Sequence, residues 1–179
     1  MLLHQELTIR RADRADLNAL ATMMVTFRDF LDQTSPAESE LRESLQQLLS
    51  DPATDFLLAV SASTAVGYAQ CRYRYSAWIS GLEMELEDLW VAAEARRQAV
   101  GSQLLQEVIR LATERRCRSI AVSTNEHNHA ALALYTRFDF HCARPRWNGG
   151  RQLWLVRPVA IAAPRQEKTD GRRETGDGS

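Results

Sequence analysis

The chain has 179 residues, 45% of them hydrophobic, which is enough to bury one substantial core and predicts a single domain. A net charge of −1 gives no electrostatic footprint for nucleic acid or for an anionic membrane surface. Three cysteines without C-x-x-C spacing, and no apolar run of the ~20 residues that span a bilayer, indicate a reducing compartment and a cytoplasmic protein.

The first third of the chain predicts one strand followed by two helices. Residues 7–10 alternate and contain β-branched side chains, as strands do. Asp13 can cap an amphipathic helix over residues 14–32, in which apolar side chains recur every three or four positions. A second helix start is signalled by Ser35 as N-cap, Pro36 at the first helical position and Glu38 three residues after the cap. This helix ends before Asp51-Pro52.

Two strands, residues 56–60 and 66–75, are joined by a polar turn and predict an antiparallel hairpin. Period two places Tyr73 and Tyr75 on one face of the second strand. Together with Trp78 and Trp90 they either line an acceptor pocket or are ordinary aromatic residues at the edge of the core.

The strand over residues 83–91 is unusual because it carries four carboxylates in six positions. Buried carboxylates are costly without partners or a function. We expect Glu83 and Glu85 to lie in water, and Glu87 and Asp88 to be functional. An unbroken strand puts these last two on opposite faces, and a bulge would exchange the assignments.

A short basic turn follows this strand and leads into an amphipathic helix from about Ala99 toward Arg115. The N–H groups at such a helix start suit phosphate oxygens, and Arg96 and Arg97 add positive charge. Neither a Walker-type motif nor G-x-G-x-x-G occurs, so taken alone the turn is equally typical of a solvated surface.

The remainder predicts a buried strand over 118–124, a helix that starts at Asn128, and two closing strands, 140–144 and 152–157, separated by an Asn148-Gly149 turn. His127 and His129 lack a carboxylate or cysteine partner pattern, so we expect no metal. Residues 1–162 form the expected domain, and the polar residues 163–179 a disordered tail.

Two stretches of the chain resemble the GNAT superfamily of N-acetyltransferases. Its first motif, V-x-x-x-x-R-x-x-G-x-G/A, matches at Val91, Arg96 and Gly101. Its second, N-x-x-A-x-x-L-Y-x-K/R-x-G-F, matches at six positions: Asn128, Ala131, Leu134, Tyr135, Arg137 and Phe140. The resemblance covers residues 7–158 and implies an α/β (α+β) fold, with a mixed, mostly antiparallel sheet of six to seven strands flanked by about four helices.

The resemblance also implies acetyl-CoA as co-substrate and a role for each matched residue. Tyr135 would protonate the departing thiolate. Glu87 would take the proton of the amine, since Leu86-Glu87-Asp88 is similar to a segment of spermidine/spermine acetyltransferases; Asp88 is the alternative base. The coenzyme would contact the end of the strand, the turn and the two helix starts, namely Leu89, Trp90, Val91, Arg96, Arg97, Gln98, Ala99, Val100, Gly101, Ser102 and Asn128.

Two positions depart from the family pattern, Ala99 and Asp139, where glycines are usual. Ala99 fits if its backbone is helical, and Asp139 requires either a left-handed conformation or a different turn after the helix. The expected activity is acetyl transfer to a small cationic amine. The alternatives are an acyl-CoA sensor or inactive homologue and a protein N-acetyltransferase, and whether the chain forms a homodimer is open.

Overall fold

A computed structural model describes residues 7–141 of the chain. Its elements are β1 (Leu7–Arg11), η1 (Arg14–Asp16), α1 (Leu17–Phe30), α2 (Glu38–Leu48), β2 (Thr54–Ser61), β3 (Thr64–Ser76), β4 (Gly81–Val91), η2 (Ala93–Ala95), α3 (Val100–Glu114), β5 (Ser119–Val122) and α4 (His129–Arg137). The predicted fold class and the four α-helices are confirmed. Five strands lie within the described residues. The predicted closing strands, apart from Phe140 and His141, and the expected turn, domain boundary and tail lie outside them.

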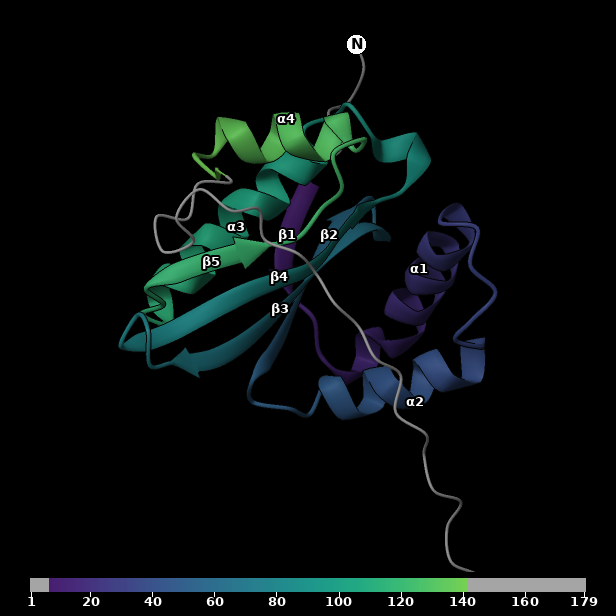
Figure 1. Ribbon diagram of the computed structural model, residues 1–179. Helices are drawn as coiled ribbons and strands as arrows, with labels where there is room; N and C mark the ends of the chain where they lie inside the picture. The colour runs from purple at the N-terminus through teal and green to yellow at the C-terminus, as the bar shows by residue number, and fades with distance from the viewer. Residues whose placement is uncertain (1–6, 142–179) are drawn as a thin grey trace, which may run out of the picture. The chain divides into compact units, whose positions relative to one another are not determined.

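The five strands form one sheet in the order β1-β2-β3-β4-β5, and all neighbours are antiparallel except β4 and β5. Helix α3 makes the crossover that a parallel pair requires. Figure 1 shows α1 and α2 on one side of the sheet and α3 with α4 on the other. Each face therefore has its own helical cover.

Two buried clusters follow from these two faces. On the α3 side, leucines and valines of the helix pack on Met84 and Leu86 of β4. On the α1 side, Leu20 and Leu45 pack with Tyr68 and Trp90. Side chains of β4 point to both faces of the sheet, and Met84 and Leu86 belong to one cluster and Trp90 to the other.

The two helix starts show one correct prediction and one error. Asp13 caps η1 as expected, because its side chain accepts from the Ala15 N–H at 2.7 Å. The second helix begins at Glu38 rather than near Ser35, with Ala37 as the N-cap residue. The Glu40 carboxylate accepts from the Ala37 N–H at 2.7 Å, and this local bond sets the later start.

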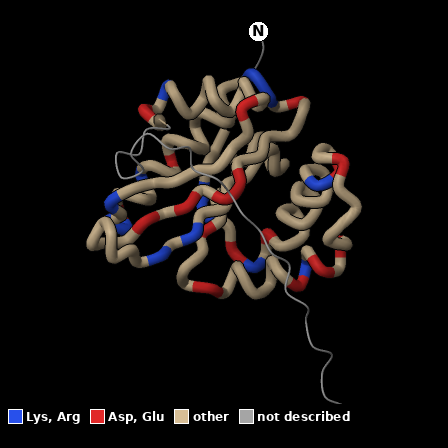
Figure 2. Tube along the Cα trace, viewed as in Figure 1, with Lys and Arg blue, Asp and Glu red and all other residues tan. Residues whose placement is uncertain are grey.

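Strand β4 is paired along its whole first half, so the expectation that Glu83 lies in water is wrong. Glu83 is 7% exposed. Arg74 of β3 donates to one of its oxygens at 2.6 Å, and Ser119 of β5 donates to the other at 3.0 Å. Acidic residues of β4 run beside basic residues of the neighbouring strand in Figure 2. Glu85 is partly exposed.

Gly67 lies at a point where β3 passes close to the backbone of β4. A Cβ at this position would lie 2.8 Å from the Trp90 carbonyl oxygen. Only glycine therefore lets β3 pass close to the part of β4 that carries Trp90.

Candidate active site

The predicted face ambiguity of β4 is resolved by a β-bulge at Glu87. Gln70 of β3 lies opposite Asp88, whereas the next residue of β3 lies opposite Leu86, so Glu87 is the extra residue. The Gln70 amide donates to Glu87, and the Tyr68 hydroxyl donates to Asp88 at 3.3 Å. Tyr68 and Gln70 are two positions apart and share a face. Both carboxylates therefore point to the α1 side of the sheet.

The environment makes both carboxylates more basic than usual. Partial burial raises the pKa of Glu87, and the charges of Glu85 and Asp88 raise it further, against Arg72 and the Gln70 hydrogen bond. Burial also raises the pKa of Asp88, opposed by the Tyr68 hydrogen bond. A carboxylate with a raised pKa is a better acceptor of a proton near neutral pH.

Tyr135 lies on α4, beyond the point where β4 and β5 stop pairing. The parallel ladder ends at Leu86 and Val122. Burial raises the pKa of Tyr135 to about 12, and the negative charge of Asp88 adds to the effect. The hydroxyl therefore stays protonated at neutral pH and can donate a proton.

The end of α4 holds the Tyr135 ring in place. Asp139 adopts φ 62°, the left-handed conformation that was one of the two alternatives for this position. The Phe140 N–H donates to the Tyr135 carbonyl at 3.1 Å and the Asp139 N–H to Thr136 at 3.2 Å, which completes a Schellman motif. The rings of Tyr135 and Phe140 lie 5.6 Å apart.

The basic turn between η2 and α3 contains two left-handed residues, Arg97 with φ 61° and Ala99 with φ 64°. The condition under which alanine would fit, a helical backbone at position 99, is therefore not met. Helix α3 starts at Val100, and the Ala99 carbonyl accepts its first bond, from the Gln103 N–H at 3.0 Å. The N–H groups of the first turn have no intrahelical partner and are suited to bind an anion.

Other residues of the two motifs connect the surrounding elements. Asn128 is the N-cap of α4, and its side chain accepts from the Ala131 N–H at 3.1 Å. Arg137 donates to the Ser102 hydroxyl at 3.0 Å and so ties α4 to the first turn of α3. Gln98 donates to the Glu94 carbonyl at 2.8 Å. Their coenzyme contacts remain predictions.

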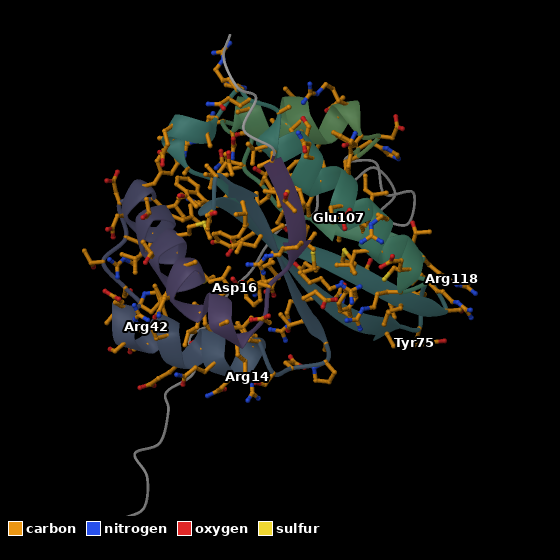
Figure 3. The ribbon with its side chains drawn as sticks, turned by 180° about the vertical axis from the view of Figure 1, so that it is seen from behind. Arg14, Asp16, Arg42, Tyr75, Glu107 and Arg118 are labelled. Carbon is orange, nitrogen blue, oxygen red and sulfur yellow. The ribbon has the colours of Figure 1, made fainter. Side chains whose placement is uncertain are left out.

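The four aromatic residues considered for an acceptor pocket do not come together. Tyr73 belongs to the α3-side cluster and donates to Asp55 at 2.8 Å, while Trp90 lies on the α1 side. Tyr75 and Trp78 are 75% and 88% exposed. Figure 3 shows Tyr75 at the far end of the β3–β4 hairpin, near Arg118.

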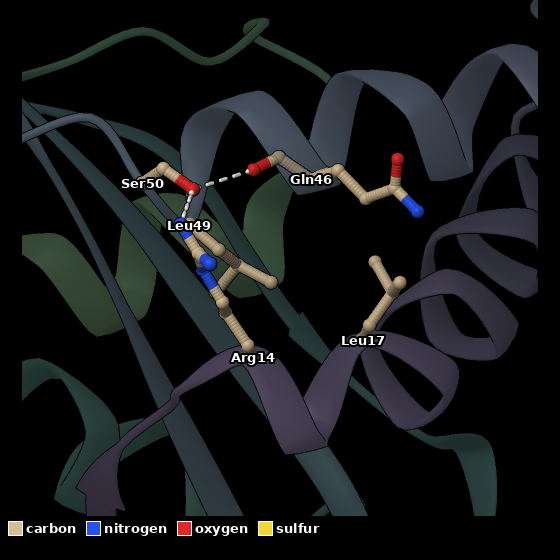
Figure 4. Close-up of a pocket in the computed structure, with 5 residues that line it drawn as sticks. All are labelled: Arg14, Leu17, Gln46, Leu49 and Ser50. Atoms are coloured by element: carbon tan, nitrogen blue, oxygen red, sulfur yellow. Dashed lines mark hydrogen bonds between the residues drawn. The ribbon is translucent and has the colours of Figure 1, made fainter.

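A shallow hollow of about 430 Å³ lies between the start of α1 and the end of α2. Figure 4 shows its lining, in which Arg14 donates to Ser50 at 2.9 Å. None of the predicted site residues lines it. Within residues 7–141, no group of three or more His, Cys, Asp or Glu side chains is arranged to hold a metal ion. No helix in this part of the chain is long and apolar enough to cross a membrane.

Sequence reasoning missed the two β3 side chains that hold the carboxylates, Tyr68 and Gln70. Their signal is present in the strand pattern, which puts both on one face. The register that sets them opposite Glu87 and Asp88 depends on the bulge, and no local pattern in β3 reports it.

A mixed sheet with a bulged acidic strand, a helix-start turn and a half-buried tyrosine fits the acetyltransferase fold that the two sequence motifs predicted. The sequence model described as the "Acetyltransferase (GNAT) family" matches residues 20–140, and the chain belongs to this family. It is an N-acetyltransferase.

Relatives and solved structures agree with this membership. The chain is 24% identical over 164 residues to a thialysine N-epsilon-acetyltransferase of Bos taurus, covering 80% of this chain and 93% of the relative. A putative acetyltransferase from Arthrobacter sp. FB24 superposes with a TM-score of 0.74 at 25% identity, over 89% and 99% of the two chains. An aminoglycoside N-acetyltransferase, AAC(6')-Iy, in complex with CoA has a TM-score of 0.68 at 17% identity, over 93% and 100%, which shows the fold alone.

Proposed function

We propose that the chain transfers the acetyl group of acetyl-CoA to the primary amine of a small cationic acceptor by direct attack. The observation that carries this proposal is the bulge, which turns Glu87 and Asp88 to one face of β4 and gives each a hydrogen-bond donor from β3. Tyr135, whose hydroxyl stays protonated at neutral pH, would supply the acid.

Coenzyme binding is assigned to the turn between η2 and α3. Its pyrophosphate would meet the N–H groups at the start of α3, where the helix dipole is positive. Arg97 and the backbone of residues 98–102 provide the remaining contacts. That AAC(6')-Iy was solved with CoA supports this placement by analogy of fold.

The reaction begins with the acceptor as an ammonium, because an alkyl amine has a pKa near ~10. Glu87 accepts one proton, and the freed nitrogen attacks the thioester carbon. Backbone N–H groups on the edge of β4 near Leu89 would stabilise the oxyanion, since the described β5 ends its pairing at Leu86. The C–S bond then breaks, Tyr135 gives its proton to the thiolate, and the second proton that the attacking nitrogen loses returns to the tyrosine oxygen.

The charge of the site favours a cationic acceptor. Arg74 and Ser119 engage Glu83, whereas Glu85, Glu87 and Asp88 present negative charge on the same face. Negative charge attracts an ammonium and raises its local concentration. The bovine relative is named for thialysine, and several structural neighbours are aminoglycoside acetyltransferases. Thialysine and aminoglycosides are small amines of this kind.

A product assay with a matched pair of variants tests the proposal. Acetylated product is detected by mass after incubation with acetyl-CoA and either small diamines, aminoglycosides, neutral amino-acid amides or peptides. Glu87→Gln should need a higher pH for the same turnover. Glu85→Gln, which removes the neighbouring charge, should raise the acceptor KM without removing the catalytic base. Peptides as the preferred acceptor would refute the small-amine assignment.

A further inference from the structure

Arg96, a matched residue of the first family motif, lies in the basic turn between η2 and α3 and directs its side chain toward the end of β4 and the end of α1. Its Nε donates to the Val91 carbonyl at 3.0 Å. Its guanidinium carbon lies 4.5 Å from the centre of the Trp90 ring and 4.8 Å from that of Phe30. A planar cation over two aromatic faces is a favourable arrangement that arginine makes better than lysine.

The two rings belong to the acceptor side of the sheet. Trp90 shares a face of β4 with Asp88 and is 6% exposed. It stacks on Phe27 of α1 at 4.8 Å, and Phe30 tilts against it at 5.1 Å. Phe30 is the last residue of α1 and is 59% exposed. Arg96 therefore joins the coenzyme turn to the C-terminal end of α1.

We infer that Arg96 is a positioning residue that holds the C-terminal end of α1 against Trp90 and so couples the coenzyme turn to acceptor binding. This inference rests on the proposed function for the identity of the acceptor side. Arg96 belongs to the same turn as Arg97 and Ala99, whose backbone is fixed in left-handed conformations. A coenzyme that orders this turn also orders the surface on which the acceptor rests.

The exposure of Phe30 explains why the contact matters. A mostly exposed ring at a helix end has few neighbours to fix it. The Phe30 ring contacts the Trp90 ring and the Arg96 guanidinium. Among residues 7–141, removal of the guanidinium leaves Phe30 with the ring contact to Trp90. Two cation–π contacts, each counted at the strength typical of an exposed site, together correspond to roughly a fivefold to thirtyfold change in an equilibrium constant.

A double-mutant cycle tests the coupling. Arg96→Met and Phe30→Ala should each raise the acceptor KM, by about tenfold for the arginine variant, with kcat and coenzyme affinity little changed. The double variant should raise the acceptor KM by less than the product of the two single fold-changes, because both substitutions remove the contact between Arg96 and Phe30. Arg96→Lys, which keeps the charge, should recover part of the loss and replaces Arg96→Met if that variant does not fold.

Arg42→Met is the matched control. Arg42 also contacts α1, where its Nη1 donates to Asn18 at 2.7 Å near the opposite end of the helix. This variant should leave the acceptor KM unchanged. Arg96→Met would overturn the inference if it weakened coenzyme binding with the acceptor KM unaltered, since Arg96 would then serve the phosphates.

Hydrogen exchange separates this inference from the proposed function, because it needs no turnover. Amides of residues 26–34 should exchange faster in Arg96→Met than in the wild type, and CoA should slow them in the wild type only. If no acceptor is acetylated but this pattern holds, the proposed function fails and the coupling stands. Equal exchange in both proteins would overturn the coupling.

Discussion

Ala99 occupies a left-handed position at the start of α3, so replacing it with glycine should stabilise the protein. Its φ is 64°. A left-handed L-residue costs about 1–2 kcal/mol, which glycine avoids. Glycine gives back about 0.4–1 kcal/mol through the entropy of the unfolded chain. The expected net gain for Ala99→Gly is about 0.5–1 kcal/mol, or roughly 1–4 °C in Tm for a chain of this size.

Thermal unfolding of three variants without coenzyme measures this effect. Ala62→Gly, at φ 47° in the turn between β2 and β3, should give a similar gain. Ala92→Gly, at φ −54°, should instead lower Tm. Calorimetry should show tighter CoA binding for Ala99→Gly and no change for Ala62→Gly. A Tm for Ala99→Gly that falls as in Ala92→Gly would refute the argument from backbone strain.

Three further substitutions probe the site. Gln70→Met should shift the acid limb of the pH–rate profile to higher pH, because Glu87 loses a hydrogen bond that lowers its pKa; an unmoved limb would exclude Glu87 as the titrating base. Tyr135→Phe should cut kcat about 10²- to 10⁴-fold with CoA affinity retained by calorimetry, and equal turnover would remove Tyr135 from the mechanism. Gly101→Ala should raise Tm, since its Cβ would make ordinary contacts, the nearest with Leu134 at 3.6 Å, but should weaken CoA binding if phosphate approaches this turn.

Local signals in the sequence predicted the elements that local forces determine. The hairpin of β2 and β3, the Asp13 cap and the helix predicted from about Ala99, which starts at Val100, all appear in the structure. The left-handed Asp139 also followed from its own conformational tolerance. The misplaced start of α2 shows the limit of such signals. Ser35 indicated an earlier start, whereas the helix begins after Ala37, whose N–H donates to Glu40.

The geometry of the site depended on partners distant in sequence. Glu83 is buried because Arg74 and Ser119 approach it from the two neighbouring strands. The common face of Glu87 and Asp88 depends on a bulge in the pairing with β3. Arg96 meets a ring 66 positions earlier in the chain, at the end of α1. Such contacts follow from the sheet register and the helix packing, which no short sequence pattern specifies.

Acetyl transfer from acetyl-CoA to a small cationic amine is tested most directly by amine-dependent release of the CoA thiol. The assay uses the full chain with acetyl-CoA and a panel of diamines, aminoglycosides, amino acids and short peptides, with calorimetric binding of CoA alongside. We predict thiol release with cationic small amines and near-background release from Tyr135→Phe. Tight CoA binding without release for any amine would contradict it and favour a coenzyme sensor.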